Sequence, residues 1–247
     1  MASSGPIGFF PDGALEWRPA PIADSNVSVT FDSFSRGNDP NRFGTEAFYA
    51  SLGRAFVAMC AAVPALFVIE ALDVWLKAGL DVTAGIIPRR IDGLDGIFFG
   101  PFLHHGFDHL YSNSVPLILL GTFVLATGAR RFLYSTLVIM FVSGLGVWIT
   151  GSPQSIVVGA SGVIFGYLGL LLMRGIVERS WWNFGVVLLV GLLYGWQLFG
   201  VLPTDEPISW QGHLFGLLGG MVAAVLFRRR RPRNDDPYRS ESTLTLP

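Results

Sequence analysis

Cysteine is almost absent from the sequence: the 247 residues include only Cys60, which lies inside an apolar run. A single cysteine excludes an internal disulfide and any metal cluster built on cysteines, and Cys60 is interpreted as a small core residue. Charge is also scarce, since 14% of the residues are charged and the formal net charge is −1. This balance provides no electrostatic footprint for nucleic acid, so no nucleic-acid partner is expected.

A secretory signal is missing as well. The first fifty residues lack the basic start, apolar core and small-residue cleavage site of such a signal. They are instead rich in Pro, Asp, Asn, Ser and Gly, a composition that cannot offset the entropy lost on ordering. Residues 1–50 are therefore predicted to be a mostly disordered cytoplasmic arm, whose aromatic side chains make at most transient contacts with lipid or a partner.

Apolar residues take the place of the missing charge, at 51% of the chain, with 20 Phe and 7 Trp. Such a composition is typical of membrane proteins, and six apolar runs approach the ~20 residues that a helix needs to cross a bilayer. We predict an all-α polytopic membrane protein, with a six-transmembrane-helix bundle in residues 51–228 and a basic cytoplasmic tail at 229–247. The expected helices lie at about 55–76, 110–127, 132–150, 161–173, 181–202 and 210–227, and the fourth is short.

A long connection, residues 79–107, separates the first two expected helices. It is too long and too apolar for a plain linker, and its Ile-Phe-Phe patch at 97–99 predicts an element that lies at the outer membrane interface. Glu70 and Asp73 share a face near the outer end of the first helix, where we expect structural pairing rather than a proton relay. The basic residues that can pair with Asp73 are Lys77, Arg89 and Arg90.

Lysine and arginine predict the orientation, because they accumulate in cytoplasmic loops. Most basic residues, including the cluster Arg228–Arg231, fall on one side of the expected bundle, and only three fall on the other. Six crossings then place both termini in the cytoplasm and residues 204–206 outside. The arginine cluster is expected to attract anionic lipid headgroups. No organelle presequence is visible, so a bacterial plasma membrane is expected.

Two polar residues interrupt the apolar helices in a way that indicates chemistry. Ser161 follows a Gly-Ala pair at the start of the fourth helix, and His213 is a lone imidazole in the sixth. Counting back from the next basic residue at ~1.5 Å per residue places both ~20 Å above the inner membrane boundary. Residues 151–160 must then reach that depth as an irregular re-entrant loop, which is tolerated only inside protein or beside a water-filled cavity.

Glycines at four-residue spacing predict that the fourth and sixth helices approach closely. They are Gly162 and Gly166 in the fourth helix, and Gly212, Gly216 and Gly220 in the sixth. Close packing would bring the Ser161 hydroxyl within reach of His213 as its base. His109, Asn113 and the Ser161 backbone N–H are candidate oxyanion donors, although counting along the helix places Asn113 at ~26 Å and His109 at ~31 Å.

Three motifs together resemble the rhomboid family of intramembrane serine proteases. They are Gly159-Ala160-Ser161-Gly162, the stretch Gly212 to Gly220 that contains His213, Gly216 and Gly220, and the set His104, His109 and Asn113. The resemblance covers about residues 54–227. It implies a Ser161–His213 dyad without an acid, oxyanion donors at His109, Asn113 and Ser161, and a structural role for His104. It also implies transmembrane protein substrates that are unwound near the site, and no metal or organic cofactor.

The sequence departs from the family pattern in two places. The first outer loop often carries a Trp-Arg pair in the family, whereas this chain has Pro88-Arg89-Arg90. One turn after the serine a Tyr is common, whereas this chain has Phe165, which can stack on the base but offers no hydroxyl.

Other functions fit the residues less well. A soluble α/β-hydrolase elbow needs glycine at position 163, which is Val. A metal site built from the four histidines has only Asp108 nearby as a carboxylate, and a transporter would show paired broken helices in corresponding halves. The main alternative is a non-catalytic rhomboid-like pseudoprotease that binds transmembrane clients. Such proteins usually lack the dyad, and both of its residues are present here.

Overall fold

The computed structural model describes residues 43–178, 181–198, 202 and 209–228. The predicted arm up to residue 42, the predicted tail from residue 229 and the acidic loop at 203–208 lie outside the described residues. The described residues are helical, and the β-structure among them is limited to an isolated antiparallel bridge between Ile86 and Val157. The prediction of an all-α protein is confirmed for this part of the chain.

Six helices of 17 or more residues form the described bundle. They are α2 (Glu46–Leu76), α5 (Phe107–Leu125), α6 (Ala129–Thr150), α7 (Ser161–Glu178), α8 (Trp181–Leu198) and α9 (Trp210–Leu226). Each follows an apolar stretch, which forms a helix because a chain surrounded by lipid must satisfy its backbone hydrogen bonds internally. Among the described residues, α2, α6 and α7 are long and apolar enough to cross a membrane, and α9 is a shorter apolar helix.

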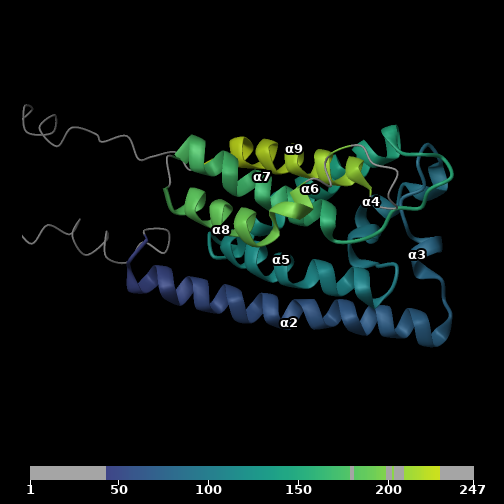
Figure 1. Cartoon of the computed structure of the whole chain (residues 1–247), viewed down its shortest axis with the longest axis horizontal. Helices are drawn as coiled ribbons and strands as arrows, with labels where there is room; N and C mark the ends of the chain where they lie inside the picture. Colours follow the sequence, from purple (N-terminus) through teal and green to yellow (C-terminus); the bar gives the residue numbers. More distant parts are fainter. Residues whose placement is uncertain (1–42, 179–180, 199–201, 203–208, 229–247) are drawn as a thin grey trace, which may run out of the picture. The chain divides into compact units, whose positions relative to one another are not determined.

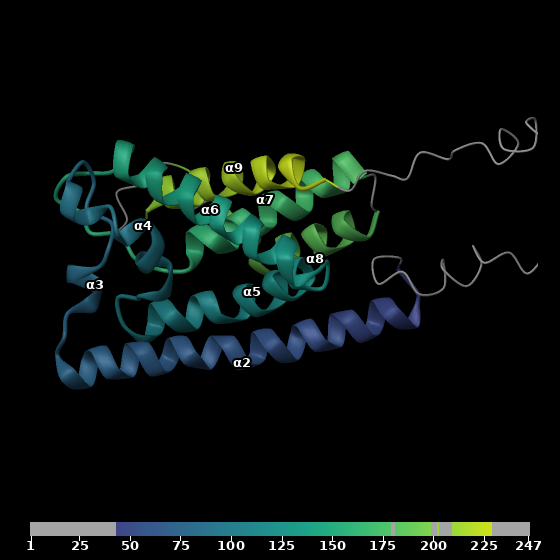
Figure 2. The same ribbon diagram turned by 180° about the vertical axis from the view of Figure 1, so that it is seen from behind.

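Helix α7 is the most enclosed of these spans. It packs against α5, α6, α8 and α9, and 61% of its apolar window is buried, compared with 28% for α2 and 39% for α6. Helix α2 lies along α5 in both views, and α2 begins at the end of the bundle where α9 ends (Figure 1, Figure 2). Side chains that fill the shared core include Met59, Leu120, Ile139, Leu171 and Ala223. Ser161, at the start of α7, is half-buried, and the fully buried part of the helix begins at Val163.

Helix α2 begins at Glu46, nine residues before its predicted start at residue 55. Thr45 caps the helix, because its hydroxyl accepts a hydrogen bond from the Phe48 N–H at 3.1 Å. The rings of Phe43 and Phe48 then pack on Trp182 of α8, with centroid separations of 4.5 and 5.5 Å. Phe43, which was expected to make only transient contacts, therefore stacks on a residue of the bundle.

Helix α7 begins at Ser161, as predicted, but it continues to Glu178, five residues beyond its predicted end. The prediction of a short fourth helix is wrong, because Arg174 does not end the helix. Its guanidinium is buried and pairs with Glu178 one turn later, at 3.2 Å. An ion pair at this spacing stabilises a helix rather than terminating it.

The connection between α2 and α5 is folded into short helices. These are α3 (Leu80–Thr83), η1 (Ile91–Gly93), α4 (Gly96–Phe99) and η2 (Gly100–Phe102). Phe98 and Phe99 expose 47% and 57% of their surface although they are large and apolar. Such rings suit a headgroup-level position, so the interfacial placement of this connection stays a prediction that the exposed rings favour.

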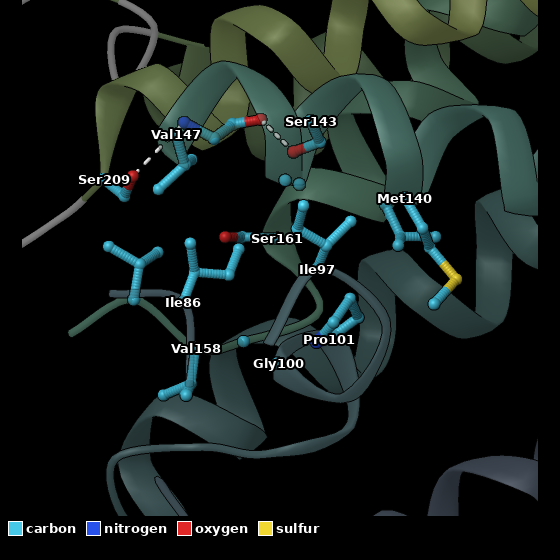
Figure 3. A pocket seen from close by; sticks show the side chains of 16 residues that line it. Ile86, Ile97, Gly100, Pro101, Met140, Ser143, Val147, Val158, Ser161 and Ser209 are labelled. Carbon is cyan, nitrogen blue, oxygen red and sulfur yellow. Dashed lines mark hydrogen bonds between the residues drawn. The ribbon is translucent and has the colours of Figure 1, made fainter. Parts of the chain in front are cut away.

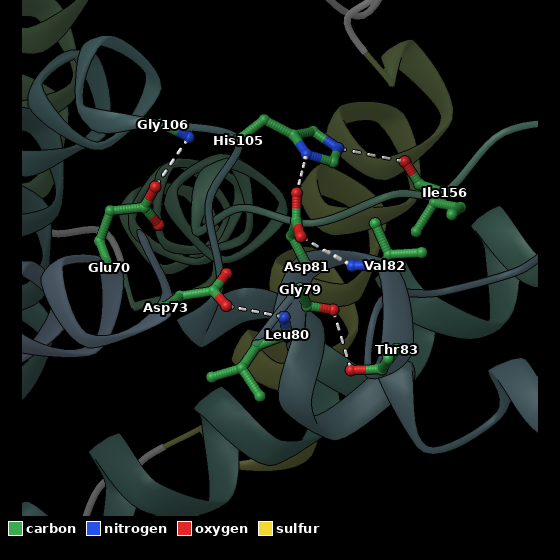
Figure 4. Close-up of polar contacts among 10 residues, drawn as sticks. All are labelled: Glu70, Asp73, Gly79, Leu80, Asp81, Val82, Thr83, His105, Gly106 and Ile156. Atoms are coloured by element: carbon green, nitrogen blue, oxygen red, sulfur yellow. Dashed lines mark hydrogen bonds and ion pairs between the residues drawn. The ribbon is translucent and has the colours of Figure 1, made fainter. Parts of the chain in front are cut away.

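The carboxylates near the C-terminal end of α2 bind backbone groups of this connection (Figure 4). Glu70 accepts a hydrogen bond from the Gly106 N–H and Asp73 accepts one from the Leu80 N–H, both at 2.9 Å. Among the described residues, no ion pair joins Asp73 to Lys77, Arg89 or Arg90; Arg89 binds the Gly151 carbonyl and Arg90 pairs with Asp92. The structural interpretation of these acids thus holds, with backbone N–H groups as their partners.

Candidate functional site

Ser161 is the first residue of α7 and lines a small cavity of about 30 Å³ (Figure 3). Its hydroxyl points into the space between the side chains of Ile86, Ile97 and Val147. A water molecule needs at least about 10–15 Å³ of such space, so the cavity has room for one or two waters. Because Ser161 begins a helix, its N–H belongs to the first turn, whose N–H groups have no acceptor within the helix.

His213 lies in the first turn of α9 and is 6% exposed. Its ring stacks on Phe165, with the centroids 4.2 Å apart and the planes 12° from parallel. Phe165 stands four residues after Ser161 on α7, so this contact holds the imidazole beside the turn that Ser161 begins. The prediction that Phe165 stacks on the imidazole is confirmed.

Two hydroxyl groups hold the backbone just before His213. Ser143 of α6 donates to the Gly212 carbonyl at 2.8 Å, and Ser209 accepts from the Gly212 N–H at 3.2 Å. Both serines also line the cavity. The sequence analysis missed them, although Ser209 carries a detectable signal, since a serine just before an apolar helix is a typical N-cap. Ser143 carries none, because it lies in the middle of an apolar run.

Helices α7 and α9 approach until their backbones touch. A Cβ atom on Gly216 would overlap the Gly162 carbonyl oxygen, and one on Gly220 would overlap the Gly166 carbonyl oxygen. No side chain larger than hydrogen fits at either position without a shift of the helices. The close approach predicted from the glycine spacing is therefore present, and it sets the distance between the helix that carries Ser161 and the helix that carries His213.

His109 and Asn113 of α5 meet the chain at Gly159, two residues before Ser161. A Cβ atom on Gly159 would lie 2.5 Å from His109 Cε1 and 3.7 Å from Asn113 Nδ2. Gly159 also has a φ of +118°, a backbone conformation that side chains disfavour. The structure thus brings the predicted oxyanion donors to the irregular segment that delivers Ser161. Their depths in the membrane, counted along the helices, stay predictions.

His104, two residues after η2, contacts the same segment. Its Nε2 accepts a hydrogen bond from the Ala160 N–H at 3.4 Å, and its ring packs edge-on against His109 with centroids 5.1 Å apart. Burial, and to a smaller extent the charges of His109 and His105, lowers the pKa of His104 to about 3. The imidazole is therefore neutral at physiological pH, and a ring whose Nε2 accepts a hydrogen bond carries its proton on Nδ1. These contacts agree with the structural role that the family resemblance implies.

Two polar atoms of this region are buried without a hydrogen-bond partner among the residues that the structure describes. They are the amide nitrogen of Asn113 and Nδ1 of His104. A buried donor that lacks a partner costs about 1–3 kcal/mol, and a catalytic role is one of the explanations for such an atom. The Asn113 amide is therefore a donor available to a ligand at Gly159 and Ser161.

The arrangement combines the parts that acyl transfer needs. A serine at a helix start faces a cavity, an imidazole is held one turn away, and an unpartnered amide donor lies against the preceding loop. In the part of the chain that the structure describes, no three His, Cys, Asp or Glu side chains are grouped as metal ligands. The chemistry that these side chains support is nucleophilic attack by Ser161.

Comparison with known proteins gives one family match and several relatives. The family described as "Rhomboid domain" matches residues 92–230. An uncharacterized protein of Mycobacterium tuberculosis, Rv1337, is 40% identical over 172 residues, which cover 66% of this chain and 71% of the relative. The uncharacterized protein ML1171 of Mycobacterium leprae is 36% identical over 169 residues, which cover 65% and 66%. Rhomboid protease GluP of Bacillus subtilis is 36% identical over 136 residues, or 50% of this chain and 24% of that protein.

Proposed function

The chain belongs to the rhomboid family, and from that premise we propose that it is an intramembrane serine endopeptidase with Ser161 as nucleophile and His213 as general base. It is an integral membrane protein, as its family and its long apolar helices indicate. The observation that carries the proposal is the stack of His213 on Phe165, one turn after a serine that faces a cavity.

In the proposed mechanism, Ser161 Oγ attacks the carbonyl carbon of a peptide bond while His213 takes the hydroxyl proton. The Ser161 N–H, the Asn113 amide and His109 then donate to the oxyanion of the tetrahedral intermediate. His213 returns the proton to the departing amine, which leaves an acyl-enzyme. A water from the cavity, activated by His213, hydrolyses the ester and restores Ser161.

The unpartnered Asn113 amide supports this assignment of the oxyanion site. A donor that is already desolvated and fixed by packing needs no reorganisation when negative charge develops. The neighbouring Gly159 supports it as well, because any side chain there would occupy the space against His109. The substrate is proposed to be a transmembrane protein whose helix is locally unwound, since a helical peptide carbonyl is bonded within its helix and closed to attack.

We further propose six membrane crossings, made by α2, α5, α6, α7, α8 and α9, with both termini in the cytoplasm of a bacterial plasma membrane. An even number of crossings fits the arrangement in which α2 begins and α9 ends at one end of the bundle (Figure 1). The segment at residues 151–160 then enters the outer part of the bilayer as a re-entrant loop. This topology divides the chain into a cytoplasmic arm at residues 1–50, the membrane bundle at residues 51–228 and a cytoplasmic tail at residues 229–247.

The test is labelling of purified protein in detergent with a fluorescent fluorophosphonate. Wild type should be labelled, Ser161→Ala and His213→Ala should not, and the remote Ser51→Ala should match wild type, because the Ser51 hydroxyl binds only the Ala126 carbonyl in the described bundle. Circular dichroism should show that all variants stay folded. Peptide cleavage that persists in folded Ser161→Ala would refute the dyad. A folded wild type that takes no label would favour the client-binding pseudoprotease.

A further inference from the structure

Arg89 has an unusual backbone conformation for its residue type. Its φ is +60°, and Arg89 and Lys77 are the two non-glycine residues with positive φ in the described part of the chain. A bulky side chain is strained there, and such strain persists only where surrounding contacts impose it. The contacts of Arg89 therefore indicate what the strained conformation serves.

All of these contacts join Arg89 to the end of α6. The Arg89 N–H donates to the Trp148 carbonyl at 3.0 Å, and its guanidinium Nη2 donates to the Gly151 carbonyl at 2.7 Å. In return, the Trp148 indole N–H donates to the Arg90 carbonyl at 2.8 Å. The last carbonyls of a helix lack internal partners and carry partial negative charge, so a cation fits this position.

Gly151 is also where the segment that leads to Ser161 begins. A Cβ atom on Gly151 would lie 2.6 Å from Pro88 Cγ, so Pro88 and the guanidinium of Arg89 enclose this residue from two sides. Further along, Ile86 and Val157 exchange backbone hydrogen bonds at 2.9 Å, and the Gly159 N–H donates to the Gly100 carbonyl at 2.9 Å. The outer connection thus holds this segment at its start, its middle and its end.

Most of these links are made by backbone atoms, which a substitution does not remove. Among the described residues, three side chains of the outer connection bind the segment. Arg89 binds Gly151 at its start, and two histidines make longer contacts near its end: His105 Nε2 lies 3.5 Å from the Ile156 carbonyl (Figure 4), and His104 Nε2 accepts from the Ala160 N–H at 3.4 Å. The shorter, charge-assisted contact is the strongest of the three. Arg89 is therefore the side chain on which the start of the segment depends.

We propose that Arg89 is a positioning residue for Ser161, because its guanidinium fixes the Gly151 carbonyl and thereby the point from which the loop at residues 151–160 reaches α7. This inference rests on the proposed function, in which Ser161 is the nucleophile. In this role Arg89 acts on Ser161 through the chain and not by contact with the substrate. It acts through ten residues of irregular chain whose direction is set at Gly151, and small displacements of a reacting group reduce rates steeply.

The test compares Arg89→Ala, Arg89→Lys and Arg89→Gly with wild type, with Arg90→Ala as the matched control. The Arg90 side chain is exposed and pairs only with Asp92 among the described residues, so its loss should change nothing. Two readouts are measured on full-length protein in detergent: the rate constant of fluorophosphonate labelling, and hydrogen exchange of the amides at residues 152–159.

Arg89→Ala is expected to label about tenfold more slowly and to exchange these amides about tenfold faster, the scale of one lost charge-assisted hydrogen bond. The amides of α2 should exchange as in wild type. Arg89→Lys should recover part of both effects, because it retains a donor. Arg89→Gly relieves the strained φ but also lacks the guanidinium, so it should label as slowly as Arg89→Ala.

Equal labelling of Arg89→Ala and wild type would overturn the proposal, whether or not exchange had changed, because the contact would then be structural only. Full recovery of labelling in Arg89→Gly would also overturn it, since strain rather than the guanidinium would be responsible. Absence of label on wild type itself would refute the proposed function and this role for Arg89 with it. Unchanged labelling of Arg89→Ala on a labelled wild type refutes the Arg89 role alone.

Discussion

Gly216→Ala tests how closely the site depends on the contact between α7 and α9. The added Cβ atom would overlap the Gly162 carbonyl oxygen, whereas an ordinary contact is 3.4–4 Å. Close-packed backbones cannot absorb this locally, so the helices must separate by about 1 Å or more. Overpacking of this kind costs ~1–3 kcal/mol, and the better helix propensity of alanine returns about 0.5–1 kcal/mol.

The net expectation is a loss of about 1–2 kcal/mol in the free energy of unfolding. The same separation moves Ser161 away from His213, and a displacement of ~1 Å can reduce turnover ~100-fold. Activity should therefore fall much further than stability. Thermal unfolding in detergent, followed by tryptophan fluorescence, measures the first effect, and the rate of fluorophosphonate labelling measures the second.

Gly185→Ala is the matched control, because a Cβ atom on Gly185 of α8 would meet no atom within 4 Å. It should unfold at or slightly above the wild-type temperature and label at the wild-type rate. If Gly216→Ala behaves like Gly185→Ala in both assays, the backbone contact between α7 and α9 does not set the geometry of the site.

Two further predictions concern the groups around Gly159. Asn113→Ala should lower kcat about 100- to 1000-fold with little change in KM, the cost of one oxyanion donor, and unchanged steady-state kinetics would remove Asn113 from the site. His104 has a folded-state pKa of about 3, below the ~6.5 of the unfolded chain, so below pH 6.5 only the unfolded state takes up its proton. The contribution of His104 to the free energy of unfolding should be fully present above pH 6.5. It should be lost as the pH falls towards 3, by up to about 1.4 kcal/mol per pH unit. His104→Gln keeps an acceptor for the Ala160 N–H, so its unfolding temperature should depend less on pH than that of wild type in thermal melts at a series of pH values. If both proteins showed the same pH dependence, His104 would not be the group responsible for it.

Patterns that repeat along a helix could be predicted from the sequence. The start of α7 at Ser161 and the close approach of α7 and α9 are both present in the structure. The close approach rests on regular geometry, since glycine every fourth residue forms one face wherever the helix lies. The stack of Phe165 on His213 was expected from the family resemblance, in which a tyrosine at this position often stacks on the base.

Features that depend on irregular backbone could not be predicted in this way. The contact of His109 with Gly159 depends on the path of residues 151–160, to which no periodicity applies. The hydrogen bond from the Ser143 hydroxyl to the Gly212 carbonyl joins residues 69 positions apart. Nothing in the sequence near either residue indicates it. The end of α7 was misplaced because a buried arginine is rare in an apolar helix, and its partner Glu178 becomes evident only once the helix is known to continue.

The backbone links between the outer connection and residues 151–160 constrain how these two segments can evolve. Hydrogen bonds between Ile86 and Val157, and between Gly159 and Gly100, are made by backbone atoms. A substitution that fits the local backbone leaves such links intact, whereas an inserted or deleted residue shifts the chain by about 3.3 Å per residue and unpairs every link beyond it. Glycines such as Gly151 and Gly159 are exceptions, because a side chain there would meet Pro88 or His109. Apart from such glycines, both segments are therefore constrained in length before they are constrained in composition.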